Sequence, residues 1–195
     1  MSMKRIFHTL LFSATALSFA GCNKDALSKL TDITFTQPYS FNVTFPEGAT
    51  VDTSATPVPI PGGTAALPPF SFTFPTEMRK IAEDYNTSLD KLVAVKLSSF
   101  TLSPLAPAGQ NLNFMNSVEL RISAPGMSEV VVAKKSPFPK DAASISLDVV
   151  DANLKEYFIK DSVTVTVAAD VNAIPPAGTE IQLDSKYKIT ANPLK

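Results

Sequence analysis

The residues best able to do chemistry are scarce in this chain of 195 residues, which has one histidine, His8, and one cysteine, Cys22. His8 lies within an apolar N-terminal segment that Cys22 follows closely. The residues after Cys22 therefore offer neither an imidazole nor a thiol. Ser-His-Asp and Cys-His catalysis, zinc sites made of His and Cys, haem and iron–sulfur ligation and disulfide bonds need such groups. We predict no cofactor and none of these sites.

Carboxylates are the main acid–base groups that remain. A glycoside hydrolase needs two carboxyl groups about 5–10 Å apart across a cleft. Local pairs are Glu83 with Asp84, Asp148 with Asp151, and Glu156 with Asp161. Each pair has a simpler structural interpretation, on the polar side of a helix, as a helix cap or beside a second helix. Asp148, Asp151 and Asn153 offer oxygens to calcium but lack an EF-hand pattern. We therefore predict no catalytic residues, no metal site and no enzyme, with a carboxylate-based glycan hydrolase as the alternative.

The N-terminal segment has the organisation of a secretory signal peptide. Lys4 and Arg5 precede an apolar run of 14 residues, 6–19, and Ala20 and Gly21 supply small residues before Cys22. The run is too short for a hydrocarbon core about 30 Å thick. We therefore predict a leader, residues 1–21, that is cleaved between Gly21 and Cys22.

The residues around this cleavage site resemble the lipobox of bacterial lipoproteins. Phe19-Ala20-Gly21-Cys22 has small residues before the obligatory cysteine, and an aromatic residue in place of the usual leucine is found in Bacteroidota-type lipoproteins. The resemblance is confined to residues 1–25. It implies diacylation of Cys22, cleavage before it and N-acylation of the new terminus. Several acyl chains, palmitate among them, hold a protein firmly to a membrane.

The residues after Cys22 bear on sorting between membranes. Asn23 stands where an aspartate commonly retains lipoproteins at the inner membrane, so the resemblance implies an outer-membrane destination. Lys24-Asp25 is similar to part of a charged signal that sends some Bacteroidota-type lipoproteins to the cell surface. The alternative is that residues 22–31 are only a solvated tether.

Composition limits the partners. Removal of residues 1–21 leaves 195 − 21 = 174 residues, enough for one buried core. The 17 cations lose Lys4 and Arg5, so 15 stand against 18 anions and the net charge is −3. A net charge of −3 does not predict the basic surface that nucleic-acid-binding proteins use. We predict one domain, residues 32–195, attached to the membrane through lipid.

Alternation of apolar and polar residues predicts strands along most of this domain. Pro38 lacks a ladder N–H, so it should break the first segment or place it on a sheet edge. A change of phase near Ser98 and Ser99 predicts a β-bulge, and Pro125-Gly126 predicts a turn. The predicted strands lie at 33–45, 70–74, 93–102, 118–123, 129–134, 145–149, 163–167 and 181–191.

Two short helices interrupt the strands. Thr76 is the predicted cap of the first, and its buried face is Met78, Ile81, Ala82 and Tyr85. Asp151 is the predicted cap of the second, and its buried face is Leu154, Tyr157 and Phe158. About eight strands at short spacing predict a mainly β protein, an antiparallel β-sandwich. Residues 91–194 resemble immunoglobulin-like sandwiches in pattern, and more loosely uncharacterised secreted β lipoproteins, without the Cys-Trp-Cys signature.

Residues 46–69 are rich in proline, glycine, alanine and threonine and show no period. Such long loops are usually functional or disordered, so the segment is either an excursion without specific function or a partner-binding loop. A set of aromatic residues flanks it. Alternate residues on one strand face usually line a core, so we expect a core rather than a ligand face. The set is Phe41, Phe45, Phe70, Phe72 and Phe74.

Asp161-Ser162-Val163 resembles a short O-glycosylation motif of Bacteroidota-type secreted proteins. Ser162 is therefore a candidate glycosylation site, and the alternative is an outward-facing strand residue. The whole sequence predicts a lipid-anchored, non-enzymatic binding or structural protein of the outer membrane, with surface display as a further expectation. An envelope protein or a polysaccharide is the expected partner. The alternatives are the glycan hydrolase and a periplasm-facing assembly factor.

Overall fold

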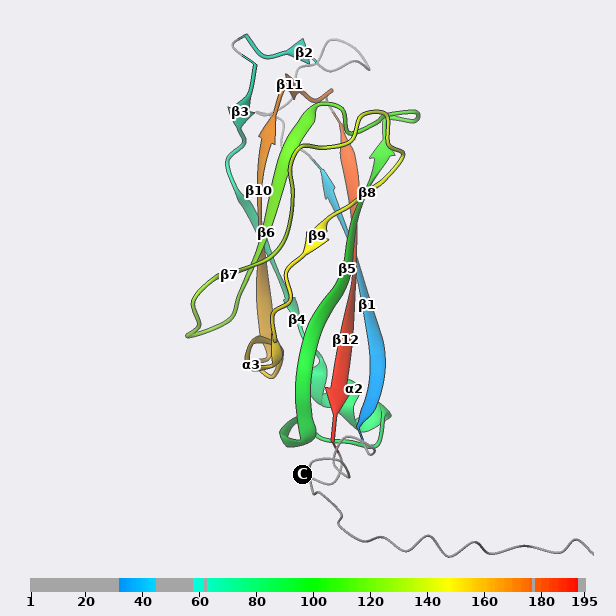
Figure 1. Cartoon of the computed structure of the whole chain (residues 1–195), viewed down its shortest axis with the longest axis vertical. Helices are drawn as coiled ribbons and strands as arrows, with labels where there is room; N and C mark the ends of the chain where they lie inside the picture. Colours follow the sequence, from blue (N-terminus) through cyan, green and yellow to red (C-terminus); the bar gives the residue numbers. More distant parts are fainter. Residues whose placement is uncertain (1–31, 45–57, 62, 177, 193–195) are drawn as a thin grey trace, which may run out of the picture.

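The computed structural model of the chain describes residues 32–44, 58–61, 63–176 and 178–192. In this part strands dominate, and antiparallel sheets pack in a sandwich-like arrangement (Figure 1). The predicted class is confirmed, with more strands than predicted because several are two residues long. The strands are β1 (Ile33–Thr44), β2 (Val58–Pro59), β3 (Ala65–Ala66), β4 (Phe70–Pro75), β5 (Leu92–Ala106), β6 (Met115–Ser123), β7 (Val130–Lys135), β8 (Ile145–Ser146), β9 (Asp148–Val149), β10 (Ser162–Val171), β11 (Ala173–Ile174) and β12 (Glu180–Ala191).

Sheet 1 contains β1, β12, β5 and β8 in this spatial order. β1 and β12 pair along their whole length, from Ile33 opposite Ala191 to Thr44 opposite Glu180. β12 pairs on its other side with β5. β1 is therefore an edge strand among the described strands, and Pro38 lies within it without ending it. This outcome confirms the edge position that Pro38 allowed.

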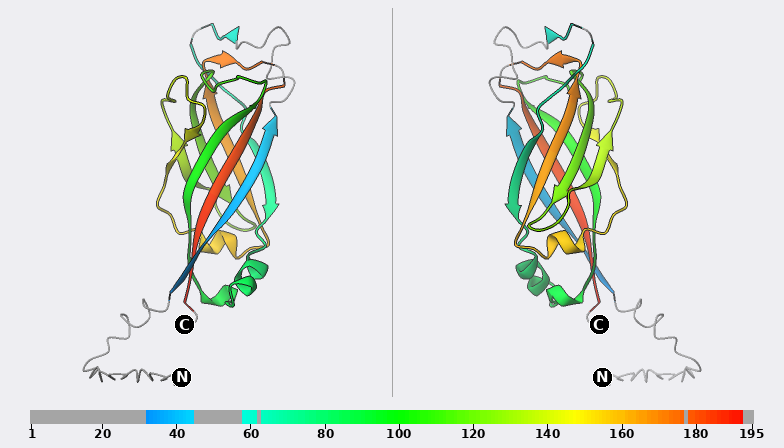
Figure 2. Two further views of the ribbon diagram at one scale, coloured as in Figure 1. Left: turned by 90° about the vertical axis from the view of Figure 1, so that its right-hand side faces the viewer. Right: turned by 90° about the vertical axis from the view of Figure 1, so that its left-hand side faces the viewer.

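Sheet 2 is built around β10, which pairs with β6 on one side and with β4 and β3 on the other. β7 and β9 continue the sheet beyond β6. β4 is thus an edge strand of sheet 2 among the described residues. β1 and β4 lie along one open side of the sandwich and run in opposite directions (Figure 2).

The core lies between the two sheets and is filled by the alternate residues that the pattern predicts. In β10 and β12 every second residue is buried, as in Val163, Val165 and Val167. The bulge is confirmed in β5: Ser99 lies opposite Lys186 and Leu97 opposite Tyr187, which leaves Ser98 as the extra residue. This extra residue lets Leu97 and Phe100 both face the core. Gly126 adopts φ +78° in the predicted turn between β6 and β7.

In the described part of the chain, three short helices occupy connections: α2 (Met78–Asp84), a 3₁₀ helix (Leu89–Lys91) and α3 (Lys155–Phe158). Their predicted caps are wrong. The N-cap residues are Glu77 and Leu154, without side-chain capping bonds. The Thr76 hydroxyl donates instead to the Lys160 carbonyl oxygen at 2.6 Å, and Asp151 pairs with Lys96. The predicted faces are largely right, because Met78, Ile81, Ala82, Leu154 and Phe158 are buried, Tyr157 is half-buried and Tyr85 is exposed.

Two other predictions need correction. The predicted strand at 145–149 is two strands: β8 pairs with β5 in sheet 1, and β9 pairs with β7 in sheet 2. Leu147 lies between them and its N–H donates to the Phe100 carbonyl oxygen at 2.9 Å, so the chain crosses from one sheet to the other. The segment 46–69 is not irregular throughout, because β2 pairs with β11 and β3 with β10. Its residues 46–57 and 62 lie outside the described residues.

The two ends of the sandwich differ. β1 begins, and β12 ends, at the end that carries α2, while β2, β3 and β11 lie at the opposite end (Figure 1). Fifteen residues of β5 at about 3.4 Å each join the two ends over about 50 Å. Among the described residues no helix has the length and apolar character needed to cross a membrane.

Candidate functional site

The acidic pairs singled out in the sequence lie on the surface. Asp148 Oδ1 is 3.0 Å from Lys135 Nζ, and Asp151 Oδ1 is 2.7 Å from Lys96 Nζ, with 70% and 81% of these aspartate side chains exposed. Ion pairs this exposed contribute little stability. The other two pairs, Glu83 with Asp84 and Glu156 with Asp161, are also exposed. Nowhere in the described residues do three His, Cys, Asp or Glu side chains gather as a metal-binding group.

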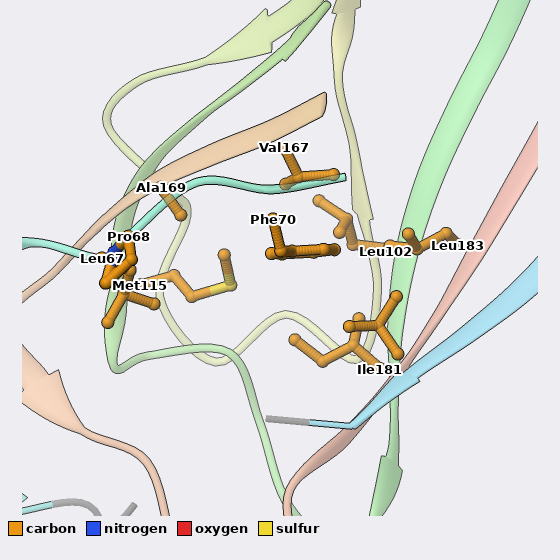
Figure 3. A pocket seen from close by; sticks show the side chains of 10 residues that line it. Leu67, Pro68, Phe70, Leu102, Met115, Val167, Ala169, Ile181 and Leu183 are labelled. Atoms are coloured by element: carbon orange, nitrogen blue, oxygen red, sulfur yellow. The ribbon is translucent and has the colours of Figure 1, made fainter. Parts of the chain in front are cut away.

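The interior holds a small cavity of about 20 Å³ beside Phe70 (Figure 3). In the close-up, Leu102, Met115 and Val167 surround the Phe70 ring. The other lining residues are Val43, Leu67, Pro68, Ala169, Ile181 and Leu183. Every lining side chain is apolar, and the volume is far below the roughly 300 Å³ of small-molecule sites. This cavity is a packing defect rather than a ligand site.

The candidate functional site is a groove on the open side of the sandwich, between the edge strands β1 and β4. It has a volume of about 730 Å³ and is open to solvent. We call it the edge groove. Its lining residues are Ser40, Phe41, Asn42, Val43, Thr44, Phe70, Phe72 and Thr73.

Aromatic side chains form the floor of the edge groove. The Phe41 ring lies 4.8 Å from that of Phe72 and 4.9 Å from that of Phe74, between ring centroids. Phe74 is buried, whereas Phe41, Phe70 and Phe72 are half-buried. The expectation of a core is therefore confirmed for Phe74. The half-buried rings also offer apolar surface to the groove, and Phe45 lies outside the described residues.

Polar side chains without charge form the rim. The Ser40 hydroxyl donates to Asp184 Oδ1 at 2.6 Å, and the hydroxyls of Thr73 and Thr164 share a hydrogen bond of 2.7 Å. None of the eight lining residues is charged. Three of these eight residues are phenylalanines, so the lining favours a neutral occupant. The Asp184 carboxylate, which contacts Ser40 beside the rim, already accepts hydrogen bonds from Ser40 and Gln182.

Tyr39 continues the aromatic floor beyond Phe74, at a ring-centroid distance of 5.1 Å. Its hydroxyl donates to the Thr76 carbonyl oxygen at 2.9 Å, which ties β1 to the residue after β4. Burial raises the pKa of Tyr39 to about 12, and the negative charge of Glu77 adds to the rise. Tyr39 therefore stays a neutral donor at physiological pH.

Of the other site residues predicted from the sequence, only Ser162 is among the described residues, and it does not line this groove. Gly21 and Cys22, the cleavage and lipidation residues, lie outside the described residues. Ser162 is the first residue of β10, half-buried and opposite Pro75 in the ladder. In β10 the residues that alternate with the buried valines face outward, and Ser162 is one of them. This position agrees with the alternative that Ser162 is simply an outward-facing strand residue, and its glycosylation stays a prediction.

The sequence alone does not distinguish the polar residues of the groove rim. Ser40, Asn42 and Thr73 read as ordinary outward residues of alternating strands. The available signals were Pro38 and Pro75, because proline marks sheet edges. No protein-family model matches this chain, and a search of curated proteins found no match.

Proposed function

We propose that this protein is a lipid-anchored, non-enzymatic binding protein of the bacterial outer membrane. The binding role is carried by one observation, the edge groove, which combines apolar rings, uncharged polar groups and access to solvent. The anchoring role is supported by the leader that ends in Gly21-Cys22. An envelope protein is the favoured partner, because the lining offers no charged residue and no exposed tryptophan platform for a polysaccharide.

The position of β1 supports this arrangement. Ten residues, 23–32, separate Cys22 from Ile33, where β1 begins at the α2 end of the sandwich. A lipid on Cys22 would hold that end toward the membrane. The edge groove lies along the second half of β1, from Ser40 to Thr44, and so toward the opposite end. A partner approaching from the aqueous side would reach it.

The test of anchoring compares the chain with a Cys22→Ala variant. We expect the unchanged chain to fractionate with membranes and to carry acyl chains by mass spectrometry of its N-terminal peptide. Cys22→Ala should be released or retained with its leader, and a Ser28→Ala control should behave as the unchanged chain. Membrane association of an unacylated Cys22→Ala chain with a cleaved leader would refute lipid anchoring.

The side of the membrane is decided by protease treatment of intact and lysed cells. Digestion of the sandwich on intact cells would support surface display and the role of Lys24-Asp25 as a sorting signal. Protection until lysis would exclude surface display and favour a periplasm-facing assembly factor.

A further inference from the structure

The backbone of β1 shows which of its groups are unpaired. The Tyr39 carbonyl oxygen points toward β12, because it accepts a hydrogen bond from the Ser185 hydroxyl at 3.3 Å and Ser185 lies opposite Tyr39 in the ladder. Backbone direction alternates along a strand, so the odd-numbered residues of β1 face β12. Even-numbered residues then direct their N–H and C=O groups away from sheet 1. Pro38 is even-numbered, and its carbonyl oxygen accepts a hydrogen bond from the Gln37 side chain at 3.2 Å rather than from β12, in agreement with this alternation.

The same argument applies to β4. The N–H of Thr76 donates to the Asp161 carbonyl oxygen at 3.0 Å, so Thr76 faces β10. By alternation Phe74 and Phe72 also face β10, whereas Ser71, Thr73 and Pro75 direct their backbone groups away. Pro75, like Pro38, therefore places its missing N–H on the unpaired side, where proline is tolerated.

The unpaired groups meet along the edge groove. β1 and β4 lie along the same open side of the sandwich (Figure 2). By the alternation argued above, Ser40, Asn42 and Thr44 of β1 and Ser71 and Thr73 of β4 direct N–H and C=O groups to this side. No described strand pairs with either edge. Sheets in a sandwich lie about 10 Å apart, and neighbouring strands lie about 4.8 Å apart. The distance between the two sheets therefore equals about two spacings between neighbouring strands. One added strand can then lie between β1 and β4 at hydrogen-bonding distance from each.

We propose that the edge groove binds one extended peptide segment of a partner protein as an added strand that pairs with β1 and β4 together. The free backbone groups of both edges supply its hydrogen bonds, a known mode of peptide recognition. Its inward side chains pack on Phe41 and Phe72, so alternate residues are apolar. The lining has no charged residue and so favours an uncharged segment, and Pro38 and Pro75 limit the segment to about five residues beside 40–44. The inference deepens the proposed binding role and does not depend on the lipid anchor.

The direct test uses a displayed library of uncharged hexapeptides with apolar residues at alternate positions, selected against the full chain purified in detergent. We expect selected peptides to keep this alternation. A synthetic copy should slow hydrogen exchange at the amides of Ser40, Asn42, Thr44, Ser71 and Thr73. A library that yields no binder would overturn the proposal.

Backbone methylation of the synthetic peptide distinguishes two-sided pairing from addition to one edge. In an inserted strand, alternate N–H groups face β1 and β4. N-methylation of either alternate set should therefore weaken binding by about fivefold or more per lost hydrogen bond. Loss of affinity with only one set would show pairing to a single edge and overturn insertion between the two.

Two substitutions by proline in β1 serve as matched variants. Asn42→Pro removes an outward N–H inside the groove, whereas Thr36→Pro removes an outward N–H outside it. Both should lower the melting temperature by only a few degrees and to a similar extent, and only Asn42→Pro should lower peptide affinity, by about fivefold. Equal effects of the two variants on affinity would contradict the proposal.

The proposal also requires that the outward backbone groups of β1 and β4 are unpaired in the free protein. Slow exchange of the five amides in a free monomer would assign the groove to residues of the same chain. Slow exchange in a dimer would assign it to a second copy. Either result would overturn a partner peptide, while the Cys22→Ala fractionation would still test anchoring separately.

Discussion

At the scale of single residues, the hydroxyls and rings around Tyr39 join the two sheets at their open side. Tyr39 contacts the rings of Phe74 and Tyr187, and its hydroxyl reaches the Thr76 carbonyl oxygen. Burial raises the pKa of both Tyr39 and Tyr187. The cluster therefore stabilises the fold only while its phenols stay protonated.

Alkaline pH should reveal this dependence. Below pH 10 the Tyr39 phenol is protonated in both the folded and the unfolded chain. As pH rises from the ordinary value of 10.0 toward about 12, the unfolded chain ionises first, so the free energy of unfolding falls. Tyr39→Phe should reduce the slope measured by urea unfolding at several pH values. The surface variant Tyr85→Phe is the control, and an unchanged slope in Tyr39→Phe would contradict the assignment.

Phe74 tests the aromatic floor as part of the core. Its side chain is 7% exposed and contacts Phe41 and Tyr39. Phe74→Ala should lower the free energy of unfolding by about 3–5 kcal/mol through lost transfer energy and a cavity. Ser71→Ala on the exposed face of β4 should cost about 1 kcal/mol or less. Comparable losses in the two variants would mean that Phe74 is not a core residue.

At the scale of elements, an edge strand tolerates the loss of a backbone N–H on its unpaired side, whereas a central strand does not. Thr36→Pro in the edge strand β1 removes an outward N–H. Thr166→Pro in β10 removes an N–H from a strand paired on both sides by β4 and β6.

We expect Thr36→Pro to cost about 1 kcal/mol or less and Thr166→Pro on the order of 3 kcal/mol or more. Thermal and denaturant unfolding of the two variants measures the difference. A severe loss of stability in Thr36→Pro would show that β1 pairs on both sides.

The long strands follow from sequence because their alternation reflects burial of one face. The bulge at Ser98 also follows, since the change of phase between Leu97 and Phe100 is local. The helix caps could not be predicted from the sequence, because the Thr76 hydroxyl donates to a carbonyl oxygen 84 residues away and Asp151 forms an ion pair with Lys96. The two-residue strands carry too little pattern to predict.

The candidate site was only partly visible in the sequence. Pro38 marked an edge strand and the aromatic residues marked an apolar face. What could not be predicted is that β1 and β4 border the same opening, because they belong to different sheets and only the order of strands brings them there. A groove made by two sheet edges is a product of topology rather than of a motif.

At the scale of the whole molecule, the sandwich has one end near the predicted lipid and one end away from it. Asp90, just before β5, marks the α2 end, and Ala108, just after β5, marks the other. The length of β5 separates them by about 50 Å.

A fluorophore on Asp90→Cys in the anchored chain should therefore be quenched by lipid-headgroup quenchers more strongly than one on Ala108→Cys. Collisional quenching in vesicles measures this, with Cys22 acylated and the detergent-solubilised chain as the control. Stronger quenching at Ala108→Cys would contradict the orientation.

The pairing of β1 with β12 has a mechanical consequence. The first and last strands lie side by side and antiparallel over twelve residues, with Ile33 and Ala191 at the same end. A force that pulls these two ends apart loads the ladder one hydrogen bond at a time. A force between Ile33 and Glu180, which lies opposite Thr44 at the far end of the ladder, runs along the strands and loads all of its hydrogen bonds in shear. A tether at Ile33 and a load carried by β12 near Glu180 would therefore pull this protein in its mechanically strong direction, and forced unfolding would be slower than when Ile33 and Ala191 are pulled apart.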